Sequence, residues 1–232
     1  MKKMIYLAIP LLVFVLVITN KNITIQPATA QSQLDITQLS YGEKTKTIVI
    51  DAGHGGYDSG GISYNGIYEK DITLDVSLLL GEKLEEAGYE VIYTRTSDTV
   101  SWPSDNVADL SARVQIAEEA DADLYISLHT NSSESYDDGA YGVEGYVSSD
   151  NVETYQLCES ILDSLTALNY TMNRGVKTTD TSSLYVIDKN SIPAILLEIG
   201  FLSDSDDAAY VSSSQGCEAI ANAIYTSIIE NS

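Results

Sequence analysis

Two histidines and two glutamates in this 232-residue sequence have the residue types needed for metal-assisted hydrolysis. His54 and His129 are the only histidines, and neutral imidazole is the commonest protein ligand for zinc. Two histidines and one carboxylate leave a fourth zinc position open for water, as in hydrolytic rather than structural sites. A second carboxylate nearby can accept the proton of that water. Glu69 and Glu198 supply two carboxylates, and residue type alone leaves open which of them would bind metal.

Each of these residues also has an ordinary structural explanation. Either histidine alone could be a hydrogen-bonded structural residue, and Glu69 could be an acid that the helix dipole favours in a first turn. Glu198 is the most informative, because it interrupts the otherwise apolar segment 194–202. An ionised carboxylate there is costly unless it is paired, close to a metal or at an exposed strand end. Glu198 therefore favours a functional site.

Alternating β-branched and helical segments predict an α/β fold with about six strands and helices on both faces of the sheet. Ligands bind such sheets beyond the carboxyl ends of the strands. His54 and His129 each follow a predicted strand closely, so both fall where a site is expected. The predicted strands are 47–51, 90–94, 124–128, 142–147, 183–187 and 194–199, and the predicted helices are 69–87, 110–120, 152–168 and 217–229.

The N-terminal segment has the features of an export signal. Lys2 and Lys3 precede an apolar run over 5–18, and Ala28-Thr29-Ala30 has the small-residue pattern of a cleavage site. The alternative is an uncleaved membrane anchor, but the run is shorter than the roughly 20 residues that span a bilayer. We expect an exported protein, with a signal peptide at 1–30, a linker at 31–46 and a single domain at 47–232.

Charge and cysteines narrow the classes of partner. The formal net charge is −22, and removing 1–30 takes away three lysines and no acids, which gives −25. So acidic a chain argues against nucleic acid and anionic membranes as partners; membrane contact is expected only through an uncleaved N-terminal segment. Cys158 and Cys217 do not make a disulfide framework, and their pairing stays open. The sequence has no Cys/His cluster for a structural zinc finger.

Four motifs occur in order along the chain. They are I-V-I-D-A-G-H-G-G at 48–56, E-K-D at 69–71, S-L-H-T-N at 127–131 and P-A-I-L-L-E-I-G-F at 193–201. Together they resemble the zinc-dependent N-acetylmuramoyl-L-alanine amidases (amidase type 3) of the bacterial cell wall, over about Thr47 to Tyr210. The segments 173–177 and 184–187 also resemble that family.

The resemblance implies a twisted mixed six-stranded sheet, a Zn²⁺ cofactor and hydrolysis of the amide between N-acetylmuramic acid and L-alanine. It implies that His54, Glu69 and His129 bind zinc and that Glu198 is the catalytic glutamate. Peptidoglycan is the expected substrate, and we expect a monomer. The physiological role, whether cell separation, autolysis, sporulation or germination, stays open.

Departures from the family pattern are small. Ala52 stands where proline is common and Thr130 where alanine is common, and neither side chain is a ligand. Only twelve residues separate His129 from Gly142, too few for the helical plug that some relatives carry. Two alternatives are a zinc carboxypeptidase acting on the stem peptide and a non-catalytic wall-binding module. Asn131, Arg174 and Tyr185 could line a substrate groove, in which an arginine could pair with a carboxylate, but a surface salt bridge is the favoured explanation for Arg174.

Overall fold

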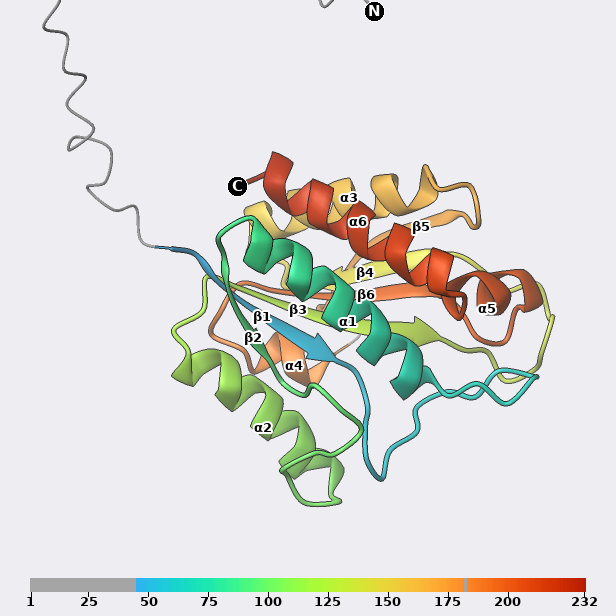
Figure 1. The fold of residues 1–232 in the computed structure, drawn as a ribbon, viewed down its shortest axis with the longest axis horizontal. Helices are drawn as coiled ribbons and strands as arrows, with labels where there is room; N and C mark the ends of the chain where they lie inside the picture. The colour runs from blue at the N-terminus through green and yellow to red at the C-terminus, as the bar shows by residue number, and fades with distance from the viewer. Residues whose placement is uncertain (1–44, 182) are drawn as a thin grey trace, which may run out of the picture. The chain divides into compact units, whose positions relative to one another are not determined.

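Six strands form one mixed sheet in the computed structural model, which describes residues 45–181 and 183–232 (Figure 1). The order across the sheet is β2-β1-β3-β6-β4-β5, and β4 pairs antiparallel with β6 while the other neighbouring pairs are parallel. The predicted mixed six-stranded sheet is therefore confirmed. The strands are β1 (Thr47–Ala52), β2 (Glu90–Tyr93), β3 (Leu124–Asn131), β4 (Val143–Val147), β5 (Asn173–Thr178) and β6 (Ala194–Phe201).

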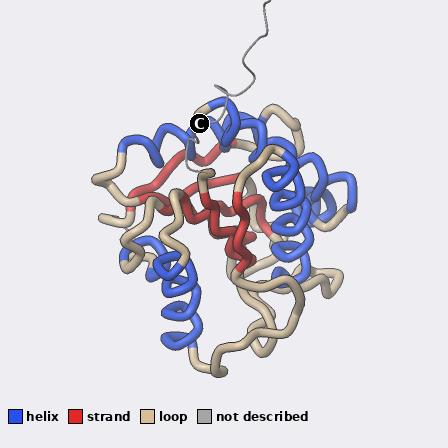
Figure 2. The backbone as a smooth tube through the Cα atoms, turned by 60° about the vertical axis from the view of Figure 1, so that its left-hand side comes forward, coloured by secondary structure: helices blue, strands red, loops and turns tan. Residues whose placement is uncertain are grey.

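Helices cover both faces of the sheet, as predicted (Figures 1 and 2). Helices α1, α3 and α6 pack together on one face, and α2 and α4 lie on the other, against β1 and β6. Helix α5 packs against β6 and α6. The helices are α1 (Glu69–Glu86), α2 (Asn106–Glu119), α3 (Val152–Thr166), α4 (Tyr185–Asp188), α5 (Ser205–Val211) and α6 (Ser214–Glu230).

The central strands are buried on both sides. Side chains alternate across a strand, so Ile48 and Ile50 of β1 join the core beneath α1, α3 and α6, whereas Val49 joins the core beneath α2 and α4. Tyr125 of β3 lies in this second core and is fully buried. Burial on two faces fixes strands β1 and β3 firmly, and with them the residues at their carboxyl ends.

One predicted strand is wrong. Residues 183–187 do not form a strand; the short helix α4 begins at Tyr185 instead. Val186 and Ile187 are both buried against the sheet, and one helical turn can bury two successive side chains on one side, whereas a strand points them to opposite faces. The β-branched residues indicated a strand, but packing on the sheet decided the conformation.

The strand that the sequence analysis did not find is β5. Its sequence N-R-G-V-K-T has a glycine, two cations and little apolar alternation. Such a composition suits the edge of a sheet, where one side of the strand has no partner and charged side chains face solvent. The predicted number of strands was thus right although one of the six was misplaced.

Several boundaries also differ from the prediction. Strand β3 continues through His129 to Asn131, so His129 lies within the strand rather than after it. Helix α2 begins at Asn106 rather than at residue 110, because Asp105 caps it by accepting a hydrogen bond from Ala108 N. Helix α5 was not predicted; Asp204 caps it in the same way.

The predicted signal peptide and nearly all of the linker lie outside the described residues, so the division at 30 and 46 stays a prediction. No helix in 45–181 or 183–232 is long and apolar enough to cross a membrane. Cys158 and Cys217 are both buried free thiols. Burial raises the pKa of Cys158 to about 12 and that of Cys217 to about 11.

Candidate metal centre

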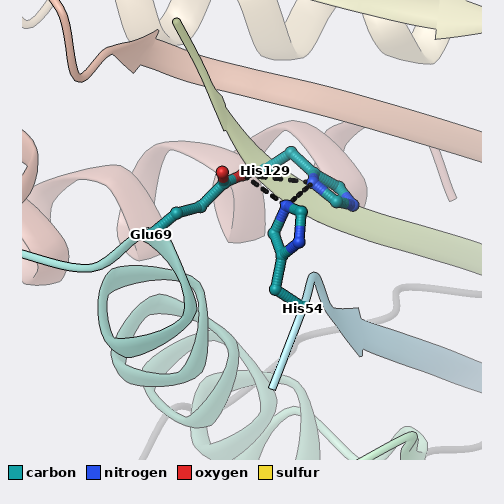
Figure 3. Close-up of side chains that lie close together, drawn as sticks. All are labelled: His54, Glu69 and His129. Atoms are coloured by element: carbon teal, nitrogen blue, oxygen red, sulfur yellow. Dashed lines mark hydrogen bonds and ion pairs between the residues drawn. The ribbon is translucent and has the colours of Figure 1, made fainter. Parts of the chain in front are cut away.

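Three side chains from separate elements converge at the carboxyl end of the sheet (Figure 3). His54 follows β1, Glu69 begins α1 and His129 lies in β3. The His54 Nε2, His129 Nδ1 and Glu69 Oε1 atoms form a triangle in which each pair is 3.1 Å apart. The structure thus brings together the three residues that the sequence analysis named as ligands.

This triangle fits a zinc ion. Tetrahedral zinc with ligands at about 2.0–2.1 Å has ligand-to-ligand edges of about 3.3–3.4 Å, close to the distances found. All three atoms have lone pairs when the imidazoles are neutral and the carboxylate is ionised. Three close acceptor atoms repel one another unless a proton or a cation lies between them, so the donor set suits a bound metal.

The His54 loop has a backbone that few residues adopt. His54 has φ of 62°, in the left-handed region that costs a non-glycine residue about 1–3 kcal/mol. A Cβ atom on Gly53 would collide with the His129 ring, and one on Gly60 would collide with Glu69 and His54. The glycines of this loop are therefore required for the close approach of the three side chains.

Each candidate ligand is oriented by a second group. Asp58 Oδ2 lies 2.8 Å from His54 Nδ1, which leaves Nε2 directed at the triangle. Glu69 accepts hydrogen bonds from Thr130 N at Oε1 and from Gly61 N at Oε2. Outer partners of this kind fix the tautomer and orientation of metal ligands. Asp58 was missed in the sequence, although an acid four residues after a histidine in a glycine-rich loop was a usable signal.

The charges of neighbouring groups shift the pKa values of His54 and Glu69. Burial alone would lower the pKa of His54, but Glu69 and Asp58 raise it to about 9. Burial alone would raise the pKa of Glu69, but His129 and His54 hold it well below its usual range. The cluster therefore has a strong affinity for positive charge, supplied by protons in the metal-free protein.

Two buried arginines hold the backbone of the same loop. Arg113 donates to the carbonyl oxygens of Ala52 and His54, and Arg95 donates to those of Ala52 and Gly53. Arg113 also forms buried ion pairs with Asp51 and Asp109. The sequence analysis assigned no role to either arginine, because their partners are backbone atoms that no motif reveals.

Glu198 lies beside the triangle, on the strand next to β3. It pairs in register with His129 across β3 and β6. Its Oε2 atom is buried and has no hydrogen-bond partner among the described residues. Burial, aided by Glu69 and Glu144 and opposed by His129, raises the pKa of Glu198 to about 7. A buried carboxylate oxygen without a partner is costly, and a water molecule or a substrate would supply the hydrogen bond that it lacks.

A pocket of about 240 Å³ adjoins the two histidines on the α2 and α4 side. Tyr185 lines it, together with Tyr57 and Leu110, which places Tyr185 where the sequence analysis suggested a groove. Arg174 and Asn131 do not line this pocket; both contact Glu144 on the other side of Glu198. Fold and site together define an α/β protein with a three-residue centre suited to a hydrolytic metal.

Comparison with known proteins agrees with this class. A family model described as N-acetylmuramoyl-L-alanine amidase matches residues 48–230. The protein YqiI of Bacillus subtilis is 37% identical over 185 residues, which are 79% of this chain and 83% of that protein. The amidase LytC of B. subtilis is 34% identical over 78% of this chain, but this chain spans only 34% of LytC.

Solved structures show the same fold. The CwlD amidase from Clostridioides difficile superposes with a TM-score of 0.74 and 32% identity, covering 81% of this chain and 98% of that one. The chain belongs to the N-acetylmuramoyl-L-alanine amidase family, and it is a peptidoglycan hydrolase of that class. Membership favours the amidase over the two alternatives, the carboxypeptidase and the non-catalytic binding module.

Proposed function

We propose that this amidase is zinc-dependent and cuts the amide bond between the lactyl group of N-acetylmuramic acid and L-alanine. In this proposal His54, Glu69 and His129 hold the metal and Glu198 transfers protons. The single observation that carries it is the triangle of three ligand atoms, each 3.1 Å from the other two, next to a carboxylate oxygen that has no partner in the described part of the chain.

A bound zinc ion would supply Lewis-acid polarisation and a water molecule of lowered pKa. The protein residues then have separate tasks. Asp58 and the backbone amides of Gly61 and Thr130 keep the ligands in place. Glu198 accepts a proton from the attacking water and passes it to the leaving amine of L-alanine. Its position on β6, in register with His129, supports this role, because it brings the acid next to the proposed metal ligands.

The location of this activity follows from the substrate. Peptidoglycan lies outside the cytoplasmic membrane, so we propose that residues 1–30 direct export and that the enzyme acts as a monomer in the cell wall. The acidic composition supports this in one respect, since a high net charge keeps an exported protein soluble.

Zymography on purified peptidoglycan tests the proposal directly. The full chain should clear the gel, lose this activity after treatment with a chelator, and recover it when zinc is added back. Mass spectrometry of the products should show peptides that begin with L-alanine and intact glycan strands. Activity that survives removal of all metal would refute the zinc dependence, and products cut within the stem peptide would refute the bond assignment.

A further inference from the structure

A second polar cluster surrounds Glu144 on β4. Glu144 is only 2% exposed, and four side chains donate hydrogen bonds to its carboxylate. Asn131 and Tyr146 donate to Oε1, while Arg174 and Lys177 of β5 donate to Oε2. Glu144 is therefore saturated with donors, and the cluster joins β3, β4 and β5 on one face of the sheet.

The cluster carries more positive charge than Glu144 requires. One carboxylate needs one cation for neutrality, yet both Arg174 and Lys177 contact the same oxygen. Their side chains are 33% and 36% exposed, so both cations reach solvent. Arg174 also donates from Nη1 to the Tyr141 carbonyl oxygen, and its Nη2 atom makes no hydrogen bond within the described residues. The cluster thus offers a surplus charge and a spare donor to a ligand.

The cations lie next to the proposed catalytic acid. Glu144 and Glu198 are directly opposite in the antiparallel β4–β6 pair, so their side chains share a face of the sheet. The Arg174 guanidinium lies 4.8 Å from the ring centroid of Phe201, the last residue of β6. Across the strand ends, the order is therefore metal triangle, Glu198, Glu144 and then the two cations.

This half of the face is partly exposed, since the Arg174 and Lys177 side chains are 33% and 36% exposed. Helices α2 and α4 lie against β1 and β6, and in Figure 1 neither extends beneath the labelled strands β4 and β5. The Tyr146 ring, with Lys177 Nζ at 5.3 Å from its centroid, is half-buried there. A substrate that enters the metal site can extend over this surface and meet both cations.

The proposed substrate carries its negative charges on one side of the scissile amide. The lactyl group and the sugars on the acyl side are neutral once the lactyl carboxyl is in amide linkage. Free carboxylates occur on the amine side, on the peptide residues that follow L-alanine. We propose that Arg174 and Lys177 bind a stem-peptide carboxylate, so that the peptide extends over β4 and β5. This inference rests on the proposed function and adds the orientation of the substrate.

The competing explanation is that the second cation only offsets the charges of Glu144 and Glu198. The two explanations differ in what they predict for substrates of different charge. A cation that acts on the protein alone changes the rate on every substrate by the same factor. A cation that binds the substrate changes the rate only when the carboxylate is present.

The experiment compares two muropeptides with the same glycan and the same peptide. One keeps free carboxylates on the residues after L-alanine, and the other has them converted to carboxamides. Amine release by the zinc-loaded full chain gives kcat and KM for each. We expect wild-type kcat/KM to favour the carboxylate form by about 5-fold, as for a partly exposed ion pair, with the difference mainly in KM.

Single variants then locate the preference. Arg174→Gln and Lys177→Gln each leave one cation for Glu144, so both should fold, which circular dichroism checks. Each should reduce the preference to less than about 2-fold, whereas Lys177→Arg should retain it. Lys83→Gln is the matched control, because Lys83 pairs with Glu218 of α6 on the opposite face of the sheet; it should leave the preference unchanged.

Three outcomes would overturn the inference. Equal wild-type rates on the two substrates would show that no carboxylate is bound. An equal loss on both substrates in the glutamine variants would assign the cations to Glu144 and Glu198 alone. A wild-type chain that releases no amine from either substrate would refute the proposed function itself, and the orientation would fall with it.

Discussion

Replacing Asp51 with asparagine would test the network that holds the His54 loop. Asp51 is 1% exposed and accepts four hydrogen bonds. Thr94 and Arg113 donate to Oδ1, and Tyr125 and Ser127 donate to Oδ2. Arg113 in turn donates to the His54 carbonyl oxygen, so the charge of Asp51 is linked to the metal centre through one side chain.

The expected loss in the free energy of unfolding depends on which of these four hydrogen bonds asparagine can still accept. Its amide oxygen can still accept at one position, but its NH₂ group cannot accept from the two donors at the other. Breaking a buried ion pair costs about 3–5 kcal/mol, because one charge is left without a partner. Arg113 keeps Asp109 as a second partner, so we expect a loss near the lower end, about 3 kcal/mol.

The loss of stability in Asp51→Asn should become smaller as the pH falls into the acid range. Burial alone would raise the pKa of Asp51, but Arg113 and the three hydroxyl donors hold it well below its usual range. A carboxyl with a lowered folded-state pKa contributes stability above its unfolded pKa of about 3.9 and loses it as the pH falls toward the folded value. The gap between wild type and Asp51→Asn should therefore be constant near pH 7 and narrow below about pH 4.

Urea unfolding of the metal-free proteins at several pH values measures this gap, and metal-free samples avoid stabilisation by bound zinc. Asp98→Asn is the matched control, since Asp98 pairs with Lys70 at the surface and an exposed pair contributes at most about 1 kcal/mol. A gap below 1 kcal/mol for Asp51→Asn, or one that widens in acid, would show that the network does not carry the charge assigned to it.

The remaining predictions concern the site and the thiols. Glu198→Gln should keep zinc and lose about a hundredfold to ten-thousandfold in kcat; wild-type rates on muropeptides would contradict its role. Glu69→Ala, like alanine at either histidine, should lower zinc occupancy by elemental analysis, whereas the exposed Glu82→Ala on the same helix should not; full occupancy would exclude Glu69 as a ligand. Cys158 and Cys217 should resist a thiol reagent at pH 8 until the chain unfolds, because burial raises both pKa values; rapid labelling of native protein would contradict this.

The sequence was sufficient to predict the helices and strands that are determined by the hydrophobic pattern and by residues that end a helix or form a turn. Strands β1, β3 and β6 are largely apolar runs, and α1 has regular apolar spacing followed by Gly88. Glu69, His129 and Glu198 lie in these elements and His54 closely follows β1, so the approximate position of the site followed from the strand ends. The failures were β5 and α5, which were missed, and α4, whose β-branched residues suggested a strand before packing on the sheet decided its conformation.

The supporting groups of the site were harder to predict, for a physical reason. Asp58 and Arg113 act through atoms that are distant in sequence or belong to the backbone, and such contacts leave no spacing pattern. Glu144 resembles any strand residue until its neighbours are known to be Glu198 on one side and two cations on the other. A residue's type suggests what chemistry it can do, but its neighbours determine whether it does it.

The use of the few cations in this chain connects its composition to its mechanism. Residues 45–181 and 183–232 contain eight lysines and arginines. Arg95 and Arg113 hold the His54 loop, and Arg174 and Lys177 lie beyond Glu198. A chain with net charge −22 repels anionic polymers at long range, so an anionic peptide must be recognised at short range, by cations fixed in place. Glu144 fixes both cations of the proposed peptide site, at a point where screening by salt is weaker than on the open surface.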